Sequence, residues 1–447
     1  MAPSATTPGT RVNATPEKTV SFREALRTWF KIGCLGFGGP AGQIALMHRI
    51  VVDEKRWLDE RRYLHALNFC MLLPGPEAQQ LATYVGWRLH GVAGGLAAGL
   101  LFVLPGALIV LALSMLYAGY GDLALVEGIF YGIKPAVAAI VVEALLRIGK
   151  RALKGWVHVA IAAVAFVAIF FFNLPFPLVV LGAGVAGLLL PVAKAPDDIT
   201  IDSRLPPASV ARTIRTILVW LVIWLAPVAA ILAVFGPTHV LSEIAVFFSK
   251  MAVVTFGGAY AVLAYVAQAA VGEFGWLQPG EMLDGLGLAE TTPGPLILVL
   301  EFVGFMASFR DGLGMAPMLA GAIGAGVTLW VTFAPCFLWI FAFAPYVERL
   351  YANRTLGRML AAITAAVVGV ILNLALWFLL HVLFGTVTER SVGPLRLHQP
   401  EWATLDPVSL ALAVGAGIAL MRFKIGLLPV LGVAALVGAA WRLGVAG

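Results

Sequence analysis

The sequence predicts an all-α polytopic membrane protein made of two inverted-topology repeats with broken or re-entrant helices. Three observations predict this fold class. Hydrophobic residues make up 60% of the 447 residues and charged residues only 12%, whereas soluble domains carry about 25% charged residues. Apolar segments follow one another along nearly the whole chain, and the pattern of the first half recurs in the second. This composition excludes a soluble enzyme, a disordered chain and a nucleic-acid module.

Charge and cysteine content agree with a membrane location. The net charge of +6 is typical of Lys and Arg in cytoplasmic loops, and no long basic run suggests nucleic-acid binding. The three cysteines lie in apolar stretches, which argues against a disulfide framework. The first twenty residues are polar, so we expect no cleavable signal peptide and expect the first apolar segment to direct insertion.

The apolar segments divide the chain into two membrane domains. We predict an N-terminal cytoplasmic tail over 1–22, a first repeat over 23–193, a polar linker over 194–212, a connecting transmembrane helix over 213–240 and a second repeat over 241–447. Six apolar segments precede the linker, one follows it, and six more complete the chain. They lie near residues 25–51, 64–89, 91–118, 123–147, 155–172, 175–193, 213–235, 241–270, 282–308, 317–345, 357–383, 406–421 and 425–443.

A shift of 219 residues aligns the two halves without gaps over 31–76 and 250–295. Lys31 then meets Lys250, Trp57 meets Trp276, and the P-G-P at 74–76 meets the P-G-P at 293–295. Compositional bias explains matched Leu and Ala but not matched Trp and P-G-P. Further on the shift becomes 230, which predicts an insertion of eleven residues around 310–317.

Glycine and proline interrupt the first two segments of each half. The four breaks are F-G-G-P at 37–40, L-P-G-P at 73–76, F-G-G-A at 256–259 and T-P-G-P at 292–295. Such residues end or kink a helix, and broken backbone at membrane depth is tolerated only beside protein or a wet cavity. One break alone would suggest a kinked helix. Matching breaks in two repeats indicate a transporter's substrate site.

The distribution of Lys and Arg leaves two topologies open. If all thirteen segments span, the basic loop 51–63 falls outside, against the positive-inside rule. If the broken segments are re-entrant hairpins, the basic loops of the first half fall inside and only a few arginines are misplaced. The misplaced residues are Arg310, Arg390, Arg396 and Arg442. Either topology inverts the second half relative to the first.

Ionisable residues within apolar segments are costly and therefore candidates for function. Lys31 and Lys250 each precede an F-G-G break by six residues, and we expect them to bind substrate, although a lysine there could instead extend to the interface. Glu77 and Glu290 flank P-G-P breaks, as coupling or gating groups or as helix caps. Lys134 and Glu143 could pair, line the path or pack.

Each break also begins a new helix, whose unpaired N–H groups and positive end suit a tetrahedral oxyanion. We expect hydroxyl and amide donors near the breaks to complete this site. The substrate-binding candidates are Lys31, Gly38, Gly39, Pro40, Gly75, Gln79, Gln80, Lys250, Gly257, Gly258, Ala259, Thr291, Thr292 and Gly294.

No motif predicts catalysis. The chain lacks a phosphate-binding loop for ATP, shows no nucleophile with a base, and places its seven histidines without metal-ligand spacing. We therefore expect a non-enzyme without catalytic residues, metal or cofactor. An intramembrane enzyme, a passive channel and a scaffold remain the alternative classes.

The motifs F-G-G-P-A-G-Q (37–43), L-L-P-G-P-E-A-Q-Q-L-A (72–82), T-F-G-G-A-Y-A-V-L (255–263) and E-T-T-P-G-P-L (290–296) resemble the chromate ion transporter family, in its long form with two fused homologous halves. The resemblance covers nearly the whole chain apart from the tail and the linker. It implies a multi-pass protein of the bacterial inner membrane that confers chromate resistance by efflux.

The resemblance further implies secondary transport of chromate, driven by a gradient or by exchange, with the lipid bilayer and no nucleic acid as partners. Sulfate or another tetrahedral oxyanion is the alternative substrate, because chromate and sulfate share shape and charge. An anion channel is the alternative mechanism. The sequence leaves open a homodimer, the driving ion and the direction of transport.

Overall fold

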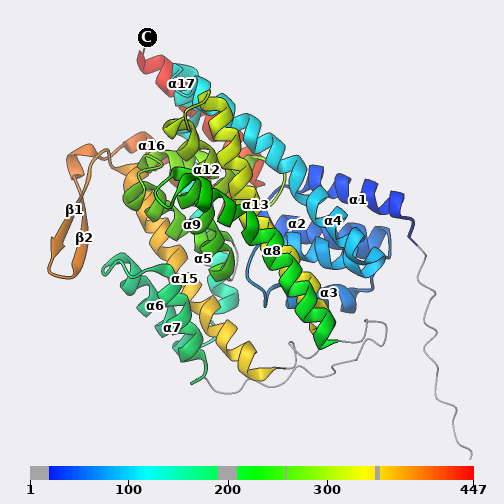
Figure 1. Ribbon diagram of the computed structural model, residues 1–447. Coiled ribbons are helices and arrows are strands. Elements are labelled where there is room, and N and C mark those ends of the chain that lie inside the picture. Colours follow the sequence, from blue (N-terminus) through cyan, green and yellow to red (C-terminus); the bar gives the residue numbers. More distant parts are fainter. Residues whose placement is uncertain (1–19, 190–208, 257–258, 348–352, 447) are drawn as a thin grey trace, which may run out of the picture.

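The computed structural model describes residues 20–189, 209–256, 259–347 and 353–446, which fold mainly as helices (Figure 1). The predicted N-terminal tail and most of the predicted linker lie outside these residues. The first half contains α1 (Phe22–Leu35), α2 (Gly39–His48), η1 (Arg49–Glu54), α3 (Glu60–Cys70), α4 (Glu77–Tyr120), α5 (Ala124–Ala152), α6 (Trp156–Phe170) and α7 (Phe176–Gly187).

The connecting helix and the second half come next along the chain. They contain α8 (Val210–Phe235), α9 (Val240–Val254), α10 (Ala259–Gln268), η2 (Ala269–Glu273), α11 (Pro279–Thr291), η3 (Leu296–Leu298), α12 (Val299–Asp311), α13 (Pro317–Phe343), η4 (Ala344–Tyr346), α15 (Arg354–Leu383), β1 (Val387–Val392), β2 (Leu395–Pro400), η5 (Trp402–Thr404), α16 (Pro407–Met421) and α17 (Leu427–Ala446).

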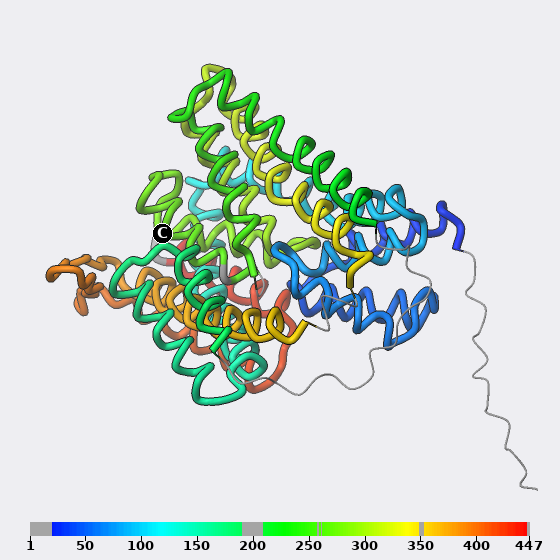
Figure 2. Tube along the Cα trace, turned by 60° about the horizontal axis from the view of Figure 1, so that its bottom comes forward, coloured from blue at the N-terminus to red at the C-terminus, as the bar shows by residue number. Residues whose placement is uncertain are grey.

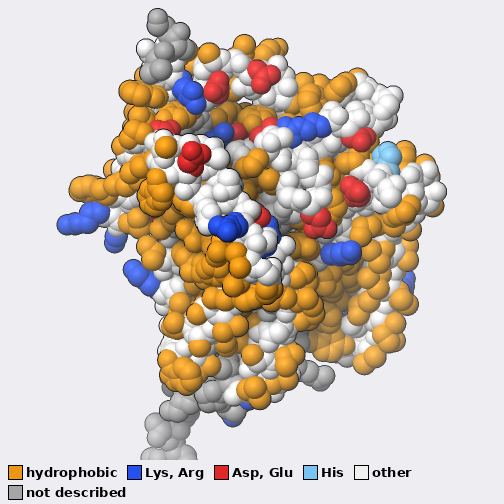
Figure 3. Space-filling view, turned by 90° about the vertical axis from the view of Figure 1, so that its left-hand side faces the viewer, with side chains coloured by type: hydrophobic (Ala, Val, Ile, Leu, Met, Phe, Trp, Pro, Cys, Tyr) orange, Lys and Arg blue, Asp and Glu red, His pale blue; other side chains and the backbone are white. Residues whose placement is uncertain are grey.

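The prediction of an all-α polytopic membrane protein is confirmed. Among the described residues, six helical segments are long and apolar enough to cross a bilayer: those of α4, α5, α8, α13 with η4, α15 and α17. Figure 3 shows hydrophobic side chains over most of the lower half of one face, while charged side chains gather in the upper half. Exposed Leu and Val side chains suit a surface that contacts lipid.

The predicted helix breaks are present. A helix ends before each of the four break motifs and another begins within the motif or directly after it, at Leu35 and Gly39, Cys70 and Glu77, Val254 and Ala259, and Thr291 and Leu296. Helices α1, α2, α3, α9, α10 and α11 have 10 to 15 residues each. A helix needs about 20 residues to span a bilayer, so none of these six helices spans it alone, and the choice between re-entrant and broken spanning segments stays a prediction.

The repeat is also visible in the backbone hydrogen bonds. Phe37 N–H donates to Leu35 O at 2.9 Å, and Phe256 N–H, 219 positions later, donates to Val254 O at 3.1 Å. The π-helical turns η1 and η2 occupy matching positions after α2 and α10. The sequence match between the halves therefore reflects matching local structures.

Helices of the two halves pack against each other. Helix α5 contacts α15, α16 and α17 of the second half, and α15 contacts α6 and α7 of the first. Gly132 of α5 lets α17 approach so closely that a Cβ there would lie 1.9 Å from Ala434 O. The connecting helix α8 lies along α13 in both views (Figures 1 and 2), where Trp220 stacks on Phe337 at 5.6 Å.

A two-stranded hairpin projects from the helices between α15 and α16 (Figure 1). Strands β1 and β2 are antiparallel, with Val387 opposite Pro400 and Val392 opposite Leu395. Arg396 anchors the hairpin twice, because its N–H donates to Phe171 O at 2.7 Å and its guanidinium pairs with Glu389. The sequence analysis predicted no strand here.

Three of the four arginines that the predicted topology misplaced have acidic partners. Arg310 pairs with Glu281 at 2.5 Å, Arg396 pairs with Glu389, and Arg442 approaches Glu127 at 3.7 Å. A paired arginine weighs less against the re-entrant topology than an unpaired one would.

Candidate functional site

The four breaks contact one another through the backbone. Gly294 N–H, in the fourth break, donates to Gly36 O beside the first break at 3.0 Å, and Gly75 N–H, in the second, donates to Thr255 O beside the third at 2.8 Å. The two bonds are equivalent under the repeat, since 36 + 219 = 255 and 75 + 219 = 294. Backbone groups at the breaks of each half therefore find hydrogen-bond partners in the other half.

Two glutamines reinforce these junctions. The Gln43 amide nitrogen donates to Gly36 O at 3.2 Å and also to Gly294 O, which joins the first break to the fourth a second time. The Gln80 amide nitrogen donates to Pro74 O at 2.6 Å. The Oε1 atoms of both side chains are buried without a partner among the described residues. Both glutamines thus donate to backbone carbonyl groups at the breaks, where no helical N–H group is available as a partner.

Glycine is required at the P-G-P breaks. Gly75 has φ +114° and Gly294 φ +105°, which side chains disfavour. A Cβ on Gly75 would also lie 2.9 Å from Gln80 Nε2 and 3.0 Å from Cys336 Sγ. Gly106 of α4 lies against the fourth break, where a Cβ would lie 2.2 Å from Pro293 O. The two P-G-P breaks are therefore packed without room for a side chain on the glycine.

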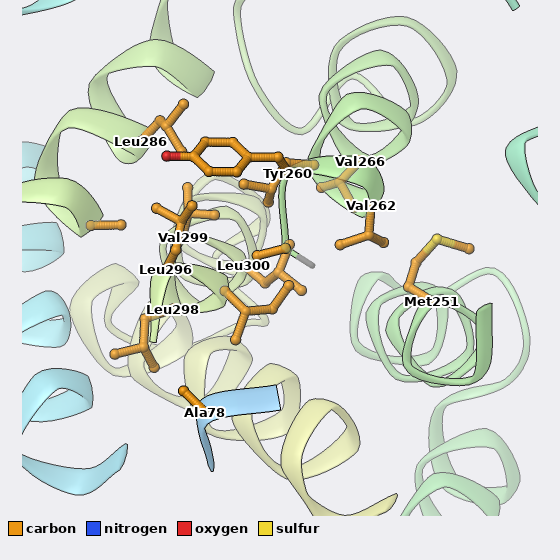
Figure 4. Packing of buried hydrophobic residues seen from close by; sticks show 14 of the residues in the cluster. Ala78, Met251, Tyr260, Val262, Val266, Leu286, Leu296, Leu298, Val299 and Leu300 are labelled. Carbon is orange, nitrogen blue, oxygen red and sulfur yellow. The ribbon is translucent and has the colours of Figure 1, made fainter. Parts of the chain in front are cut away.

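Tyr260 and Glu290 join the third break to the fourth. Tyr260 follows the third break, and its hydroxyl donates to Glu290 Oε1, just before the fourth, at 2.5 Å. Glu290 is only 2% exposed. Figure 4 shows Tyr260, Ala78 after the second break and the segment from Leu296 to Leu300 after the fourth around one buried centre. These hydrogen bonds therefore connect all four breaks into one structural unit.

A cavity of about 640 Å³ opens onto this unit. Gly38 and Gly39 of the first break line it together with Tyr260 and Glu290. Gly39 begins α2, and the first N–H groups of a helix have no partner within the helix. The cavity thus reaches the positive end of α2 and the carboxyl group of Glu290.

Basic side chains form the wall opposite the break. Arg147, Lys150 and Arg151 come from the last turns of α5, and Lys424 comes from the turn between α16 and α17. Glu143 also lines the cavity and pairs with Arg147 at 3.4 Å. Lys150, Arg151 and Lys424 have no ion-pair partner within the described part of the chain. The wall therefore carries more cations than carboxylates and suits an anion.

A family model described as "Chromate transporter" matches residues 23–188 and again 242–439. The chain belongs to the chromate transporter family. It is 34% identical over 382 residues to a chromate transport protein of Pseudomonas aeruginosa, covering 81% of this chain and 83% of that protein. No solved structure matches it.

Two further relatives match over similar lengths. A probable chromate transport protein of Synechococcus elongatus is 30% identical, covering 78% of this chain and 83% of the relative. A chromate transport protein of Cupriavidus metallidurans is 28% identical, covering 83% of this chain and 85% of the relative. Membership of this family points to a transporter and not to an enzyme.

The structure brings some predicted site residues of this chromate transporter to the cavity and leaves others away from it. Gly38, Gly39 and Glu290 line the cavity. Lys31 and Lys250 have exposed side chains on α1 and α9 and do not line it. Gly257 and Gly258 lie outside the described residues. A role for either lysine in binding stays a prediction.

The predicted hydroxyl and amide donors are already engaged. The Thr291 and Thr292 hydroxyls donate to Leu288 O at 2.9 Å and Ala289 O at 3.1 Å. The Gln79 amide nitrogen donates to Thr83 Oγ1 at 3.1 Å. These side chains satisfy neighbouring protein groups in the described state.

The remaining predicted residues shape the breaks. Glu77 is half-buried in the first turn of α4, Pro40 lies in the first turn of α2, and Ala259 begins α10. Lys134 and Glu143 do not pair with each other, because Lys134 pairs with Asp284 and Glu143 with Arg147.

Sequence reasoning missed most of the cavity wall. Arg147, Lys150, Arg151 and Lys424 lie far from the breaks in sequence, so no motif linked them to the site. Tyr260, in the F-G-G-A-Y motif, carried the one available signal, a hydroxyl directly after a break. Among the described residues, no group of three or more His, Cys, Asp or Glu side chains could hold a metal ion.

Proposed function

We propose that this protein exports chromate across the bacterial inner membrane as a secondary transporter, driven by a gradient or by exchange with another anion. The observation that carries the proposal is the basic cavity that reaches the glycine break and Glu290. Its lining has four cationic side chains and two carboxyl groups, which suits a dianion. Family membership supports chromate as that dianion.

Charge-assisted hydrogen bonds from Arg and Lys would draw the oxyanion into the cavity, and the N–H groups at the start of α2 would bind it at the break. Glu290, held by Tyr260, would lie near the bound dianion. Like charges repel, so occupancy of the cavity and the charge of Glu290 would depend on each other. This dependence is what a coupling or gating group requires.

The basic residues support export as the direction of transport. The positive-inside rule assigns 147–154 and the Arg422–Lys424 turn to the cytoplasmic side. The cationic side chains of the cavity wall, Arg147, Lys150, Arg151 and Lys424, belong to these two segments, so the proposed site would open toward the cytoplasm and collect anions there. This supports export.

A second cavity supports an inverted arrangement of the repeats. It measures about 490 Å³ and lies between the α6–α7 turn and α15, beneath the β1–β2 hairpin. Trp377 and His381 line it, and they correspond to Arg147 and Arg151 under the shift of 230, since 147 + 230 = 377 and 151 + 230 = 381. Two cavities that share these matched positions, at opposite membrane faces, would provide alternating access.

The test measures chromate uptake into everted membrane vesicles. Lys150→Gln combined with Arg147→Gln removes two cations of the wall, and we expect uptake to fall about tenfold or more, because a hydrogen bond to a charged group contributes roughly 1.5–3 kcal/mol. Lys154→Gln is the matched control, since Lys154 is exposed nearby but does not line the cavity.

Normal uptake by the Arg147→Gln/Lys150→Gln variant would contradict the assigned site. Lys31→Gln and Lys250→Gln, measured in parallel, test whether those lysines bind the anion. Sulfate added as competitor distinguishes a chromate-selective transporter from a general oxyanion transporter. Flux that does not saturate with chromate would indicate a channel.

A further inference from the structure

Helices α5 and α11 pack closely at what we call the closed end, around Asp284 and Gly287, and both line the cavity at the open end, which on α11 begins one turn further along, at Glu290. At the closed end, Gly287 of α11 packs on Ile133 of α5 so tightly that a Cβ would lie 2.5 Å from Ile133 Cγ2. At the open end, Arg147 of α5 and Glu290 of α11 both line the basic cavity. Lys134 and Arg147 are thirteen residues apart on α5, a rise of about 20 Å.

A buried ion pair fastens the closed end. Lys134 Nζ lies 3.3 Å from Asp284 Oδ2, and the Tyr117 hydroxyl of α4 donates to the same oxygen at 2.8 Å. The Asp284 side chain is only 4% exposed, whereas Lys134 is 31% exposed and reaches the surface. This pair, which we call the α5–α11 clasp, thus joins a buried carboxyl group to a partly exposed amine.

The carboxyl group of Asp284 is satisfied on one side only. Both of its donors contact Oδ2, while Oδ1 is buried with no partner among the described residues. The surroundings are apolar and aromatic, since the ring of Phe302 lies 5.3 Å from that of Tyr117 and packs on Gly285. An oxygen that carries negative charge there without a donor is costly, and a proton on Oδ1 would remove this cost.

The neighbouring charges do not supply the missing partner. Glu281, one turn before Asp284, is held by Arg310 of α12 at 2.5 Å. Arg310 also donates to Trp276 O at 2.6 Å, and no ion pair joins it to Asp284 among the described residues. Lys134 is therefore the one cation that the structure pairs with Asp284 among the described residues.

We propose that Asp284 is a proton-binding site whose occupancy opens and closes the α5–α11 clasp and so couples transport to the proton gradient; this rests on the function proposed above. A proton from bulk water binds Oδ1 and neutralises the carboxylate, and Lys134 keeps its charge and turns to water. The closed end can then separate while α5 and α11 approach each other at the basic cavity. Proton and anion thereby act on the two ends of the same helix pair.

The experiment uses the full chain in proteoliposomes with a pH-sensitive dye inside. For the wild type we expect chromate flux to be accompanied by proton flux. For Asp284→Asn we expect proton flux to fall at least tenfold, while the Kd for chromate stays within threefold because the basic cavity is intact. Glu127→Gln is the control, since Glu127 is an exposed carboxylate on α5 outside the clasp, and it should behave as the wild type.

The outcomes separate the two proposals. Chromate flux without proton flux in the wild type, or undiminished proton flux in Asp284→Asn, overturns the clasp and leaves the transport function standing. Absence of chromate flux in the wild type overturns both. If Asp284→Asn does not fold because Lys134 is left unpaired, Asp284→Asn/Lys134→Met removes both charges, and proton-coupled flux in that variant overturns the clasp.

Discussion

At the scale of single residues, the breaks depend on glycines that no side chain can replace. Gly75 and Gly294 combine a positive φ with neighbours that fill the space of a Cβ. The sequence motif predicted both positions, because P-G-P ends a helix wherever it occurs. It could not predict Gln43, whose amide bridges residues 36 and 294 and depends on how the halves pack.

We predict that Gly75→Ala and Gly294→Ala each lower the stability of the protein and abolish transport. A strained φ costs about 1–3 kcal/mol, and at Gly75 the methyl group would also displace Gln80 or Cys336. The measurement is the melting temperature in detergent together with chromate flux. Gly326→Ala on α13 is the control, because nothing lies within 4 Å of its Cβ position; equal behaviour of control and variants would contradict the prediction.

At the scale of elements, periodicity and glycine–proline motifs were sufficient to predict the helices and their interruptions. The basic wall of the cavity was not predictable in the same way, since α5, the α16–α17 turn and the first break meet only through tertiary packing. Lys31 and Lys250 are the reverse case. They match each other clearly in the sequence repeat, but their side chains are exposed. The β1–β2 hairpin was missed because its fourteen residues, 387–400, are half polar and follow an apolar helix.

The hairpin should loosen as pH falls. Burial opposes ionisation of Glu389, but Arg396 and His398 outweigh it and hold the pKa of Glu389 below its usual value. Burial also lowers the pKa of His398, against the pull of Glu389. Both groups have depressed folded-state pKa values, so each contributes stability at neutral pH. Stability should fall as pH drops below about 6.5, where His398 would be charged in the unfolded hairpin, and fall further near pH 4 as Glu389 gains a proton.

The check is hydrogen exchange of residues 387–400 at pH 7.5, 5.5 and 4. The exchange rate, divided by the intrinsic rate of an unstructured peptide at the same pH, should rise at each lower pH. Arg396→Ala should give fast exchange at every pH, because it removes the ion pair with Glu389. Exchange in the wild type that is independent of pH after that correction would refute the prediction.

At the scale of the whole molecule, the sequence repeat predicted the pairing of equivalent helices but not the way in which the halves interlock. The shift of 219 makes two hydrogen bonds equivalent: Gly294 N–H donates to Gly36 O, and Gly75 N–H donates to Thr255 O. Both bonds join one half to the other, so the sequence pattern of either half alone does not contain them. The inverted orientation of the repeats remains our proposal, supported by the two cavities whose linings share the matched positions 147/377 and 151/381.

Glu54 and Glu273 provide a matched test of inversion. They are equivalent under the shift of 219, and both are exposed. In a chain without its three native cysteines, Glu54→Cys should react with a membrane-impermeant maleimide in everted vesicles, and Glu273→Cys should react in intact spheroplasts. Labelling of both from the same side would show parallel repeats.

The crossed bonds between the breaks also limit how the molecule can be divided. Separated from its counterpart, either half would leave a backbone carbonyl and a backbone N–H at its centre without a mate, at membrane depth where water cannot replace them. If the chain is cut at the linker, we therefore expect the two halves to fold when they reassociate, and we expect neither half to fold alone.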